Sequence, residues 1–337
     1  MVTLMVRAQF IHCILGLSLL TLLCGCGESS STKPSTEAQS DKAYRIVVTT
    51  GMVKDAAAAI AGKHAAVENL IGEGSDPHLF SPSRDDVVAF DAADVILYSG
   101  LYLEGKVIQA VKGLAENKPV HGVCDSLDHE TLLHPAGEAH PDPHVWMDVK
   151  IWQEVARHTA TILKAYDPAH AAEYDANLAT YVAELSALDA YAKAVVDTVP
   201  AENRVLVTAH DAFGYFGRAY GVEVLAIQGI STESEAGLHQ INKLVDMLVA
   251  RKISAIFVES SVSDENIKAL QEGAHAKGHD VKIGGELFSD AMGAPGTYEG
   301  TYVGMIAHNV TTIARALGGT VPAGGFAGAD HSGESEE

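Results

Sequence analysis

The tripeptide Asp-Pro-His occurs twice in the chain, at residues 76–78 and 142–144. Each copy follows a predicted strand through a loop and precedes a predicted helix. Proline fixes its own φ angle and biases the preceding residue towards an extended conformation, so His78 and His144 are presented on stiff segments. An imidazole held in this way loses little conformational entropy when it binds a metal ion. The repeated motif therefore indicates a metal site.

Two further candidate ligands lie in the second half of the chain. The predicted strand at 203–208 runs into His210, and the predicted strand at 281–287 runs into Asp290. Ligands gather outside the carboxyl ends of the strands in open parallel sheets, and three imidazoles with one carboxylate complete a four-coordinate site. The residues alone leave another interpretation open, in which Asp290 is an N-cap and His210 begins a capped helix.

Parallel sheets would position these side chains, and the order of apolar and amphipathic segments along the chain predicts such sheets. Short β-branched or apolar runs alternate with longer amphipathic stretches, which is typical of an α/β protein. The predicted strands span residues 44–49, 65–71, 94–98, 119–123, 203–208, 223–227, 255–259 and 281–287. Because predicted helices separate most of these strands, we expect two parallel-sheet (β/α) lobes with the metal site in the cleft between them.

One long helix is predicted between the two lobes. Asp167 and Pro168 give an N-cap followed by proline at the first helical position, and residues 169–199 contain no glycine or proline. A helix of roughly 30 residues spans about 45 Å. We expect it to act as a rigid strut that limits how far the lobes can hinge.

The N-terminal segment is predicted to lie outside the fold. Its apolar run at 10–23 is too short to span a bilayer comfortably. The run ends at Leu-Cys-Gly-Cys, which resembles the lipobox of bacterial lipoproteins, so residues 1–25 are predicted to be a signal peptide and Cys26 to carry lipid. An ordinary secretory peptide cleaved nearby is the alternative. Residues 26–43 are rich in Ser, Thr, Lys and Glu and are predicted to be a flexible tether.

The remaining boundaries follow from the predicted elements. The N-terminal lobe spans 44–166, the linking helix 167–200 and the C-terminal lobe 201–318, and 319–337 is a disordered acidic tail. Of the four cysteines only Cys124 would remain unmodified in the mature chain, so no intramolecular disulfide is expected and this thiol is predicted to be a small buried residue.

The charge balance bears on the partners of the protein. Its 44 acidic and 23 basic residues give a formal net charge of −21. Such a chain repels nucleic acid and attracts cations. The 16 histidines are consistent with a metal partner but do not establish one.

Several motifs together resemble the metal-binding lipoproteins of bacterial ABC importers, the zinc and manganese group (cluster A-I) of solute-binding proteins. The matching stretches are GSDPH at 74–78, DPHVWMD at 142–148, TAHDAFGYF at 208–216, QGISTESEAG at 228–237 and LFSDAMG at 287–293. They occur in the order found in the family, and the resemblance covers about residues 44–318.

The resemblance implies a function and a ligand set. In that family the residues aligning with His78, His144, His210 and Asp290 bind the metal, so one zinc or manganese ion per chain is expected as cargo. The chain would be an extracytoplasmic, lipid-anchored monomer that delivers the ion to a membrane permease with a cytoplasmic ATPase. No enzymatic activity and no nucleic-acid partner are expected. A periplasmic metal buffer or adhesion lipoprotein without a transport partner is the alternative.

The ligand types bear on the choice of metal. Imidazole-rich tetrahedral sites suit zinc, and manganese prefers more oxygen ligands. A bidentate Asp290 would give five-coordination tolerable to manganese, so zinc is favoured and manganese stays open. A zinc hydrolase is the less favoured rival, because a catalytic site keeps an open position and a nearby base, whereas four protein ligands close the shell.

Other polar residues receive secondary interpretations. Glu259 ends a predicted strand at the same sheet edge and is expected to support a ligand or the structure. Ser231, Thr232 and Glu235 resemble a helix start of the capping-box kind, and Asp211 is assigned to a helix N-terminus.

The other histidines are assigned mainly to the surface or the core. His129, His134 and His140 lie in an acidic loop before the second ligand, where either a weak auxiliary metal trap or a solvated loop is open. His64 and His170 are interpreted as surface or core residues on predicted helices or turns.

Overall fold

The computed structural model describes residues 43–234 and 237–326. The predicted signal peptide at 1–25, the lipid site Cys26, almost all of the tether at 26–43, Glu235 and residues 327–337 of the predicted tail lie outside the described residues.

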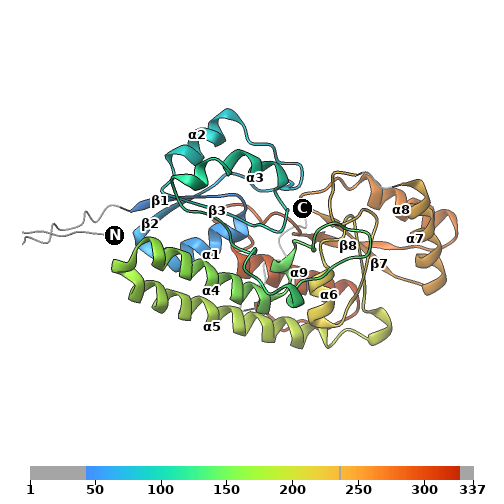
Figure 1. Cartoon of the computed structure of the whole chain (residues 1–337). Helices are drawn as coiled ribbons and strands as arrows, with labels where there is room; N and C mark the ends of the chain where they lie inside the picture. The colour runs from blue at the N-terminus through green and yellow to red at the C-terminus, as the bar shows by residue number, and fades with distance from the viewer. Residues whose placement is uncertain (1–42, 235–236, 327–337) are drawn as a thin grey trace, which may run out of the picture. The chain divides into compact units, whose positions relative to one another are not determined.

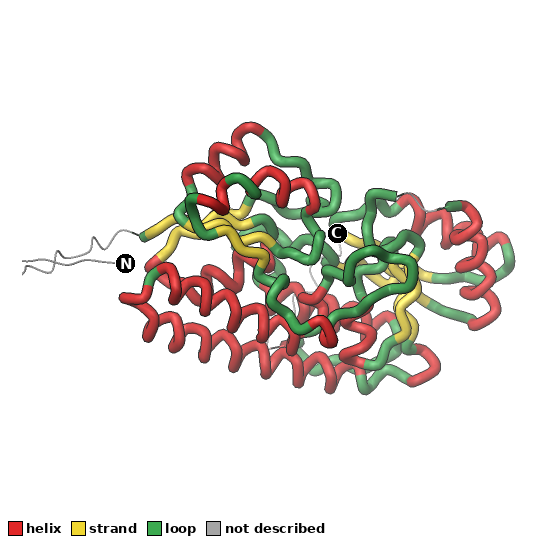
Figure 2. Tube along the Cα trace, in the orientation of Figure 1, coloured by secondary structure: helices red, strands yellow, loops and turns green. Residues whose placement is uncertain are grey.

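Strands and helices alternate along the described chain (Figures 1 and 2). The strands are β1 Tyr44–Val48, β2 Ala65–Asn69, β3 Val95–Tyr98, β4 Val120–Gly122, β5 Val205–Thr208, β6 Glu223–Ala226, β7 Ala255–Glu259 and β8 Lys282–Leu287. The α-helices are α1 Gly51–Ala61, α2 Arg84–Ala92, α3 Gly105–Val111, α4 Val149–Tyr166, α5 Ala171–Val196, α6 Gly214–Tyr220, α7 Leu238–Arg251, α8 Glu265–Ala276 and α9 Tyr302–Ala316. Short 3₁₀ turns are η1 Gly62–His64, η2 Leu114–Glu116, η3 His129–Thr131, η4 Val145–Met147, η5 Pro168–His170 and η6 Ala201–Asn203.

The first lobe is a parallel sheet covered by helices on both faces. Its strand order is β2-β1-β3-β4. Successive side chains of a strand point to opposite faces. Val47 and Ile96 therefore pack with residues of α2 and α3 on one face, while Ile46 and Leu97 join the core formed with α1 and α4 on the other. Figure 1 shows α2 and α3 on one side of the strands and α1, α4 and α5 on the opposite side.

The second lobe contains two parallel pairs of strands, β5–β6 and β7–β8, and β5 lies against β7. The sequence predicts each of these strands but not the division into pairs. The β7–β8 ladder shifts register between Ile256 and Val258, opposite Gly284 and Gly285. Gly285 has a φ angle of 145°, a conformation that glycine adopts without the steric cost of a Cβ atom. A local glycine-dependent bulge therefore interrupts this ladder.

The predicted linking helix is present as α5, which has 26 residues and spans about 39 Å at 1.5 Å per residue. A 3₁₀ turn at Pro168–His170 precedes it. The predicted N-cap bond of Asp167 is not formed, because its carboxylate instead accepts hydrogen bonds from the His170 ring and the Tyr174 hydroxyl. The helix packs on α1 and α4 of the first lobe and on α6 and α9 of the second.

A single apolar core extends through both lobes along α5. It includes Trp152 of α4, Leu185 of α5, Phe257 of β7 and Tyr302 of α9, and all four side chains are fully buried. Cys124 belongs to the same core, as predicted, and burial raises the pKa of its thiol. Within 43–234 and 237–326, none of the helices combines the length and apolar character needed to cross a bilayer.

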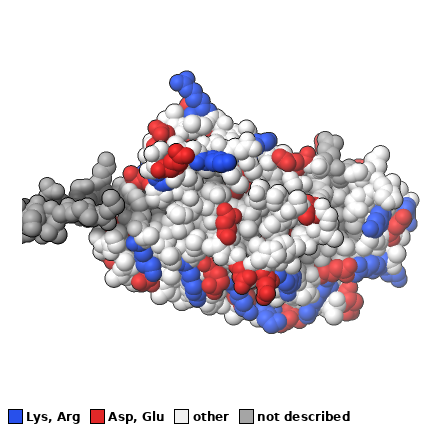
Figure 3. Space-filling model, viewed as in Figure 1, with Lys and Arg blue, Asp and Glu red and all other residues white. Residues whose placement is uncertain are grey.

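Charged side chains of both signs are interspersed on the surface. On the face seen in Figure 3, acidic and basic groups alternate along the edge where Figure 1 places α5. Charge on this edge is therefore mixed, although the chain as a whole has a net charge of −21.

Candidate metal centre

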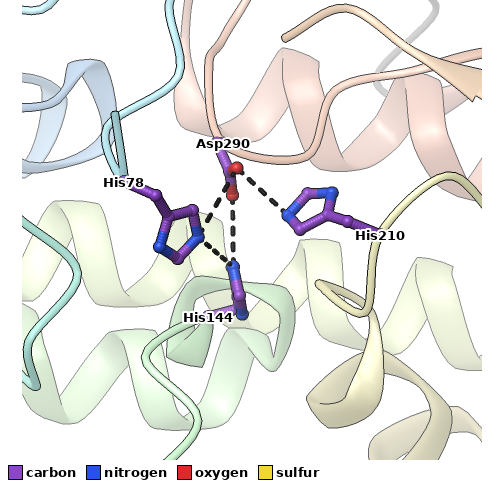
Figure 4. Close-up of side chains that lie close together, drawn as sticks. All are labelled: His78, His144, His210 and Asp290. Atoms are coloured by element: carbon purple, nitrogen blue, oxygen red, sulfur yellow. Dashed lines mark hydrogen bonds and ion pairs between the residues drawn. The ribbon is translucent and has the colours of Figure 1, made fainter. Parts of the chain in front are cut away.

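The structure brings together the four residues singled out from the sequence, as Figure 4 shows. One ligand atom from each of His78, His144, His210 and Asp290 lies within 4.8 Å of the others. Asp290 stands between the imidazoles, with carboxylate oxygens 3.9 Å from His78 Nε2, 3.3 Å from His144 Nε2 and 3.1 Å from His210 Nε2. All four residues are buried.

These side chains converge because each one follows the carboxyl end of its lobe's strands. His78 lies in the loop between β2 and α2, and His144 lies directly before η4. His210 comes two residues after β5, and Asp290 comes three residues after β8. The capping interpretation is wrong for both residues of the second lobe, because α6 begins at Gly214 and α9 begins only at Tyr302.

The two Asp-Pro-His motifs share one backbone geometry. Asp76 Oδ1 accepts a hydrogen bond of 2.8 Å from the backbone N–H of His78, and Asp142 Oδ1 accepts one of 2.9 Å from that of His144. Asp142 Oδ1 also lies 2.7 Å from His144 Nδ1. The first residue of each motif therefore fixes the backbone of its histidine, and in the second motif it fixes the ring as well.

Glu259 supports His210 in a comparable way, in agreement with the supporting role expected for it. Its Oε1 atom accepts a hydrogen bond of 2.9 Å from the His210 backbone N–H, and its Oε2 atom lies 2.5 Å from His210 Nδ1. A carboxylate at Nδ1 favours the tautomer that keeps the proton there and leaves Nε2 free for a metal ion. His144 has this hydrogen bond, whereas the Glu259 carboxylate meets His210 Nδ1 as a close ion pair. Both rings direct Nε2 towards Asp290.

The charges of the cluster shift the pKa values of its members in opposite directions. Burial lowers the pKa of His78 to about 4, so this ring is neutral at pH 7. Burial alone would lower the pKa of His144, but the charges of Asp142 and Asp290 outweigh it and raise the pKa to about 9. Glu259 and Asp290 likewise overcome burial and raise the pKa of His210. Burial would raise the pKa of Asp290, yet His210 and His144 hold it well below its usual range.

Several polar atoms of the cluster are close together but poorly aligned for hydrogen bonding. Both ring nitrogens of His210 and both carboxylate oxygens of Asp290 are buried, and none of them has a hydrogen-bond partner within the described chain. Buried polar groups left in this state destabilise a protein. Ligand atoms around a tetrahedral zinc ion lie about 3.3 Å apart, given metal–nitrogen distances of about 2.0 Å. The observed spacing therefore fits a divalent cation.

Residues far away in the sequence hold the loops of the centre. Trp146 Nε1 donates a 2.8 Å hydrogen bond to the Ser289 carbonyl, directly before Asp290. Asn309 of α9 receives a 2.9 Å hydrogen bond from the Phe288 N–H and donates one of 2.7 Å to the Phe288 carbonyl. Asn309 is not among the residues predicted from the sequence, although a polar residue within the apolar run at 302–314 is a signal for such a role.

Thr232 plays a different part from the one expected. Its hydroxyl donates a hydrogen bond of 2.5 Å to Asp76 Oδ2, which connects the second lobe to the first motif. The capping-box interpretation of this segment is wrong, because α7 begins at Leu238 with Gly237 in the N-cap position. Asp211 is also misassigned, since α6 has Phe213 at its N-cap and the Asp211 N–H bonds to the Gly229 carbonyl.

The histidines of the acidic loop lie apart from the cluster. The rings of His129 and His134 stack with centroids 4.1 Å apart, and His140 stacks on Tyr102 at 3.5 Å. Within the described residues they belong to no group of three or more metal-ligating side chains. The auxiliary metal trap stays a prediction.

Two cavities each border one residue of the cluster. A cavity of about 570 Å³ is lined by Asp290, Lys54 and Glu73, and one of about 280 Å³ is lined by His78 and Glu138.

Comparisons with known proteins agree with this architecture. A family described as zinc-uptake complex component A, periplasmic, matches residues 46–316. The manganese-binding lipoprotein MntA of Bacillus subtilis is 44% identical over 296 residues, which are 88% of this chain and 95% of that protein. The zinc-binding protein TroA of Treponema pallidum is 43% identical over 313 residues, which are 93% of this chain and 99% of that protein. The solved structure of periplasmic zinc-binding TroA matches with a TM-score of 0.80 and 44% identity, over 82% of this chain and 99% of the other.

Proposed function

Because the chain belongs to the family of periplasmic zinc-uptake components, we propose that His78, His144, His210 and Asp290 hold the ion that it carries. The chain is the substrate-binding component of an ABC-type metal uptake system, works outside the cytoplasm, and is a transport component, not an enzyme. The observation that supports the ligand assignment most directly is the burial of three imidazoles and one carboxylate whose ligand atoms lie within 4.8 Å of one another.

The chemistry of the four side chains fits zinc or manganese as the cargo. Two relatives more than 40% identical to this chain are named for different metals, manganese for MntA and zinc for TroA. Three imidazoles with one carboxylate suit zinc, whereas manganese prefers a larger share of oxygen. We favour zinc, with manganese accommodated if Asp290 binds through both of its oxygens.

The supporting carboxylates explain how the site loads. Asp142 and Glu259 hold the Nδ1 sides of His144 and His210, so both rings keep their orientation when an ion replaces the proton at Nε2. Binding then gives the buried oxygens of Asp290 a partner. The ordered ligands reduce the entropy lost on capture, and α5 keeps the accompanying movement of the lobes small.

The same family membership supports a proposal for the assembly around this site. We assign the N-terminal lobe to residues 44–166, the linking helix to 167–200 and the C-terminal lobe to 201–318. The loaded chain is proposed to act as a monomer, attached to the membrane through lipid on Cys26 and a tether at 26–43, and to dock its cleft face on a permease driven by a cytoplasmic ATPase.

The decisive experiment is a metal titration of the metal-stripped protein lacking residues 1–26. Calorimetry with zinc and with manganese would compare the wild type with His210→Ala, and His239→Ala on α7 serves as a control remote from the cluster. We expect one tightly bound equivalent in the wild type and in the control, and the loss of that tight equivalent in His210→Ala. Tight binding that survives in His210→Ala would refute the ligand assignment, and the tighter ion would indicate the cargo.

A further inference from the structure

A second group of metal-ligating side chains lies at the start of α5. His64 of η1, His170 of η5 and Glu173 of α5 each place one ligand atom within 4.8 Å of the others. His64 Nε2 is 2.9 Å from Glu173 Oε2. The rings of His64 and His170 stack with centroids 3.8 Å apart and an interplanar angle of 25°, so their edges lie side by side.

This group is separate from the ligands proposed for the cargo. His64 directly precedes β2, which begins at Ala65, so it lies at the amino ends of the strands. The cargo ligands follow the carboxyl ends of the strands, at the opposite edge of the sheet. None of the three residues contributes to the cluster around Asp290.

A carboxylate fixes the tautomer of one of the two imidazoles. His170 Nδ1 lies 2.6 Å from Asp167 Oδ2, and the Tyr174 hydroxyl donates a 2.7 Å hydrogen bond to the same oxygen. An ionised carboxylate only accepts hydrogen bonds, so the ring proton stays on Nδ1 and His170 Nε2 keeps its lone pair. This is the arrangement in which a carboxylate orients a metal-ligating histidine.

We propose that His64, His170 and Glu173 bind a second divalent transition metal ion. Two imidazoles and one carboxylate select a zinc-type ion over magnesium or calcium, which prefer oxygen ligands. Three protein ligands leave one position for water. The ion would connect the junction of η1 and β2 to the first turn of the long helix, and so would brace one end of that helix.

Three features make this site weaker than the cargo site. The Glu173 side chain is 53% exposed, and Lys63 Nζ lies 3.6 Å from its carboxylate and has to move away from an arriving ion. The amino end of a helix also carries a partial positive charge, which disfavours a cation. The site therefore fills after the cargo site when metal is added gradually.

Zinc titration of the metal-stripped full chain in detergent tests the proposal. We expect the wild type to bind two equivalents of zinc. His170→Ala should lose only the weaker equivalent and His210→Ala only the tighter one. Failure of this site is therefore distinguishable from failure of the cargo site. His275→Ala is the matched control, because His275 Nδ1 also lies 2.6 Å from a carboxylate oxygen, that of Asp280, but belongs to no ligand group in the described chain. A wild type that binds a single equivalent, or a second equivalent that survives in His170→Ala, would overturn the proposal.

A conservative variant separates loss of the site from loss of the fold. Asp167→Asn keeps a hydrogen-bond acceptor at the same place but removes the charge that orients His170. We expect about a 10- to 100-fold weaker second equivalent and an unchanged first one. Zinc-edge anomalous diffraction would then place the second ion beside the Nε2 atoms of His64 and His170 and the Glu173 carboxylate, and a peak elsewhere would contradict the assignment.

Discussion

Thr232 in the second lobe donates a hydrogen bond of 2.5 Å to Asp76 in the first lobe, through the oxygen that does not hold His78. The same carboxylate therefore contacts the His78 backbone with one oxygen and the opposite lobe with the other. Because the two bonds share one side chain, we expect movement of the lobes to be coupled to movement of His78.

Thr232→Val should accelerate metal release. Valine keeps the shape of threonine and removes only the bond to Asp76, and a hydrogen bond to a charged group contributes about 1.5–3 kcal/mol. If that bond must break before the lobes separate, the dissociation rate should rise about 10- to 100-fold. Stopped-flow release into a chelator measures this rate.

Thr180→Val is the matched control for that experiment, because Thr180 makes only a local bond to the Ala176 carbonyl on an exposed face of α5. Equal release rates in Thr232→Val and the wild type would show that the cross-lobe bond does not gate release.

The two Asp-Pro-His motifs should respond unequally to loss of charge. Asp142→Asn removes the carboxylate that orients the His144 ring and that raises the pKa of this ring. Metal affinity should therefore fall about 10- to 100-fold. Asp76→Asn changes a residue that bonds the backbone of His78, so its effect should be smaller. Competition titrations against a chromophoric chelator compare the two variants directly, and a larger loss in Asp76→Asn would contradict the assigned roles.

Metal binding should release protons at neutral pH. The pKa of His144 is raised to about 9 and that of His210 is also raised, so both rings are protonated at pH 7 in the metal-free protein. An ion displaces about two protons there, and affinity should increase between pH 7 and 9. Calorimetry in two buffers of different ionisation enthalpy counts these protons. Binding heats that do not depend on the buffer would refute the predicted release of protons.

The same pKa values make the metal-free protein sensitive to alkaline pH. His144 titrates higher in the folded chain than its ordinary value of 6.5, so its contribution to stability is complete below pH 6.5 and is lost as the pH rises through about 9. The melting temperature in EDTA should therefore fall between pH 7 and 9.5, and the zinc-loaded protein should change less. A metal-free protein that becomes more stable over this range would contradict the charge assignment.

Gly304→Ala should destabilise the loop that follows Asp290. A Cβ atom at Gly304 would overlap the carbonyl oxygen of Tyr298, so the first turn of α9 could not keep its contact with that loop. Overpacking of this kind costs about 1–3 kcal/mol. Denaturant unfolding measures the free energy, with Gly105→Ala as the control, since a Cβ at Gly105 meets no described atom within 4 Å. Equal stability of the two variants would contradict this packing.

The sequence predicts those features that are encoded locally. All eight strands are confirmed, because apolar runs bounded by turn residues are local signals, and the four residues predicted to gather at the sheet edges do lie together. Their role as ligands stays a prediction. The hydrogen bond from Thr232 to Asp76 joins residues 156 positions apart, and no pattern within either segment indicates that these two residues meet. The same holds for Asn309, whose partner Phe288 lies 21 positions away in the loop after β8.

The apolar core that passes along α5 limits where the chain can be divided. Trp152 and Tyr302, one from each lobe, stack with ring centroids 5.3 Å apart, and Leu185 of the helix is buried in the same core. A cut or a recombination joint at the helix would expose this apolar surface on both fragments. The lobes should therefore melt in one cooperative transition. Recombination between related genes should exchange the whole chain and not a single lobe.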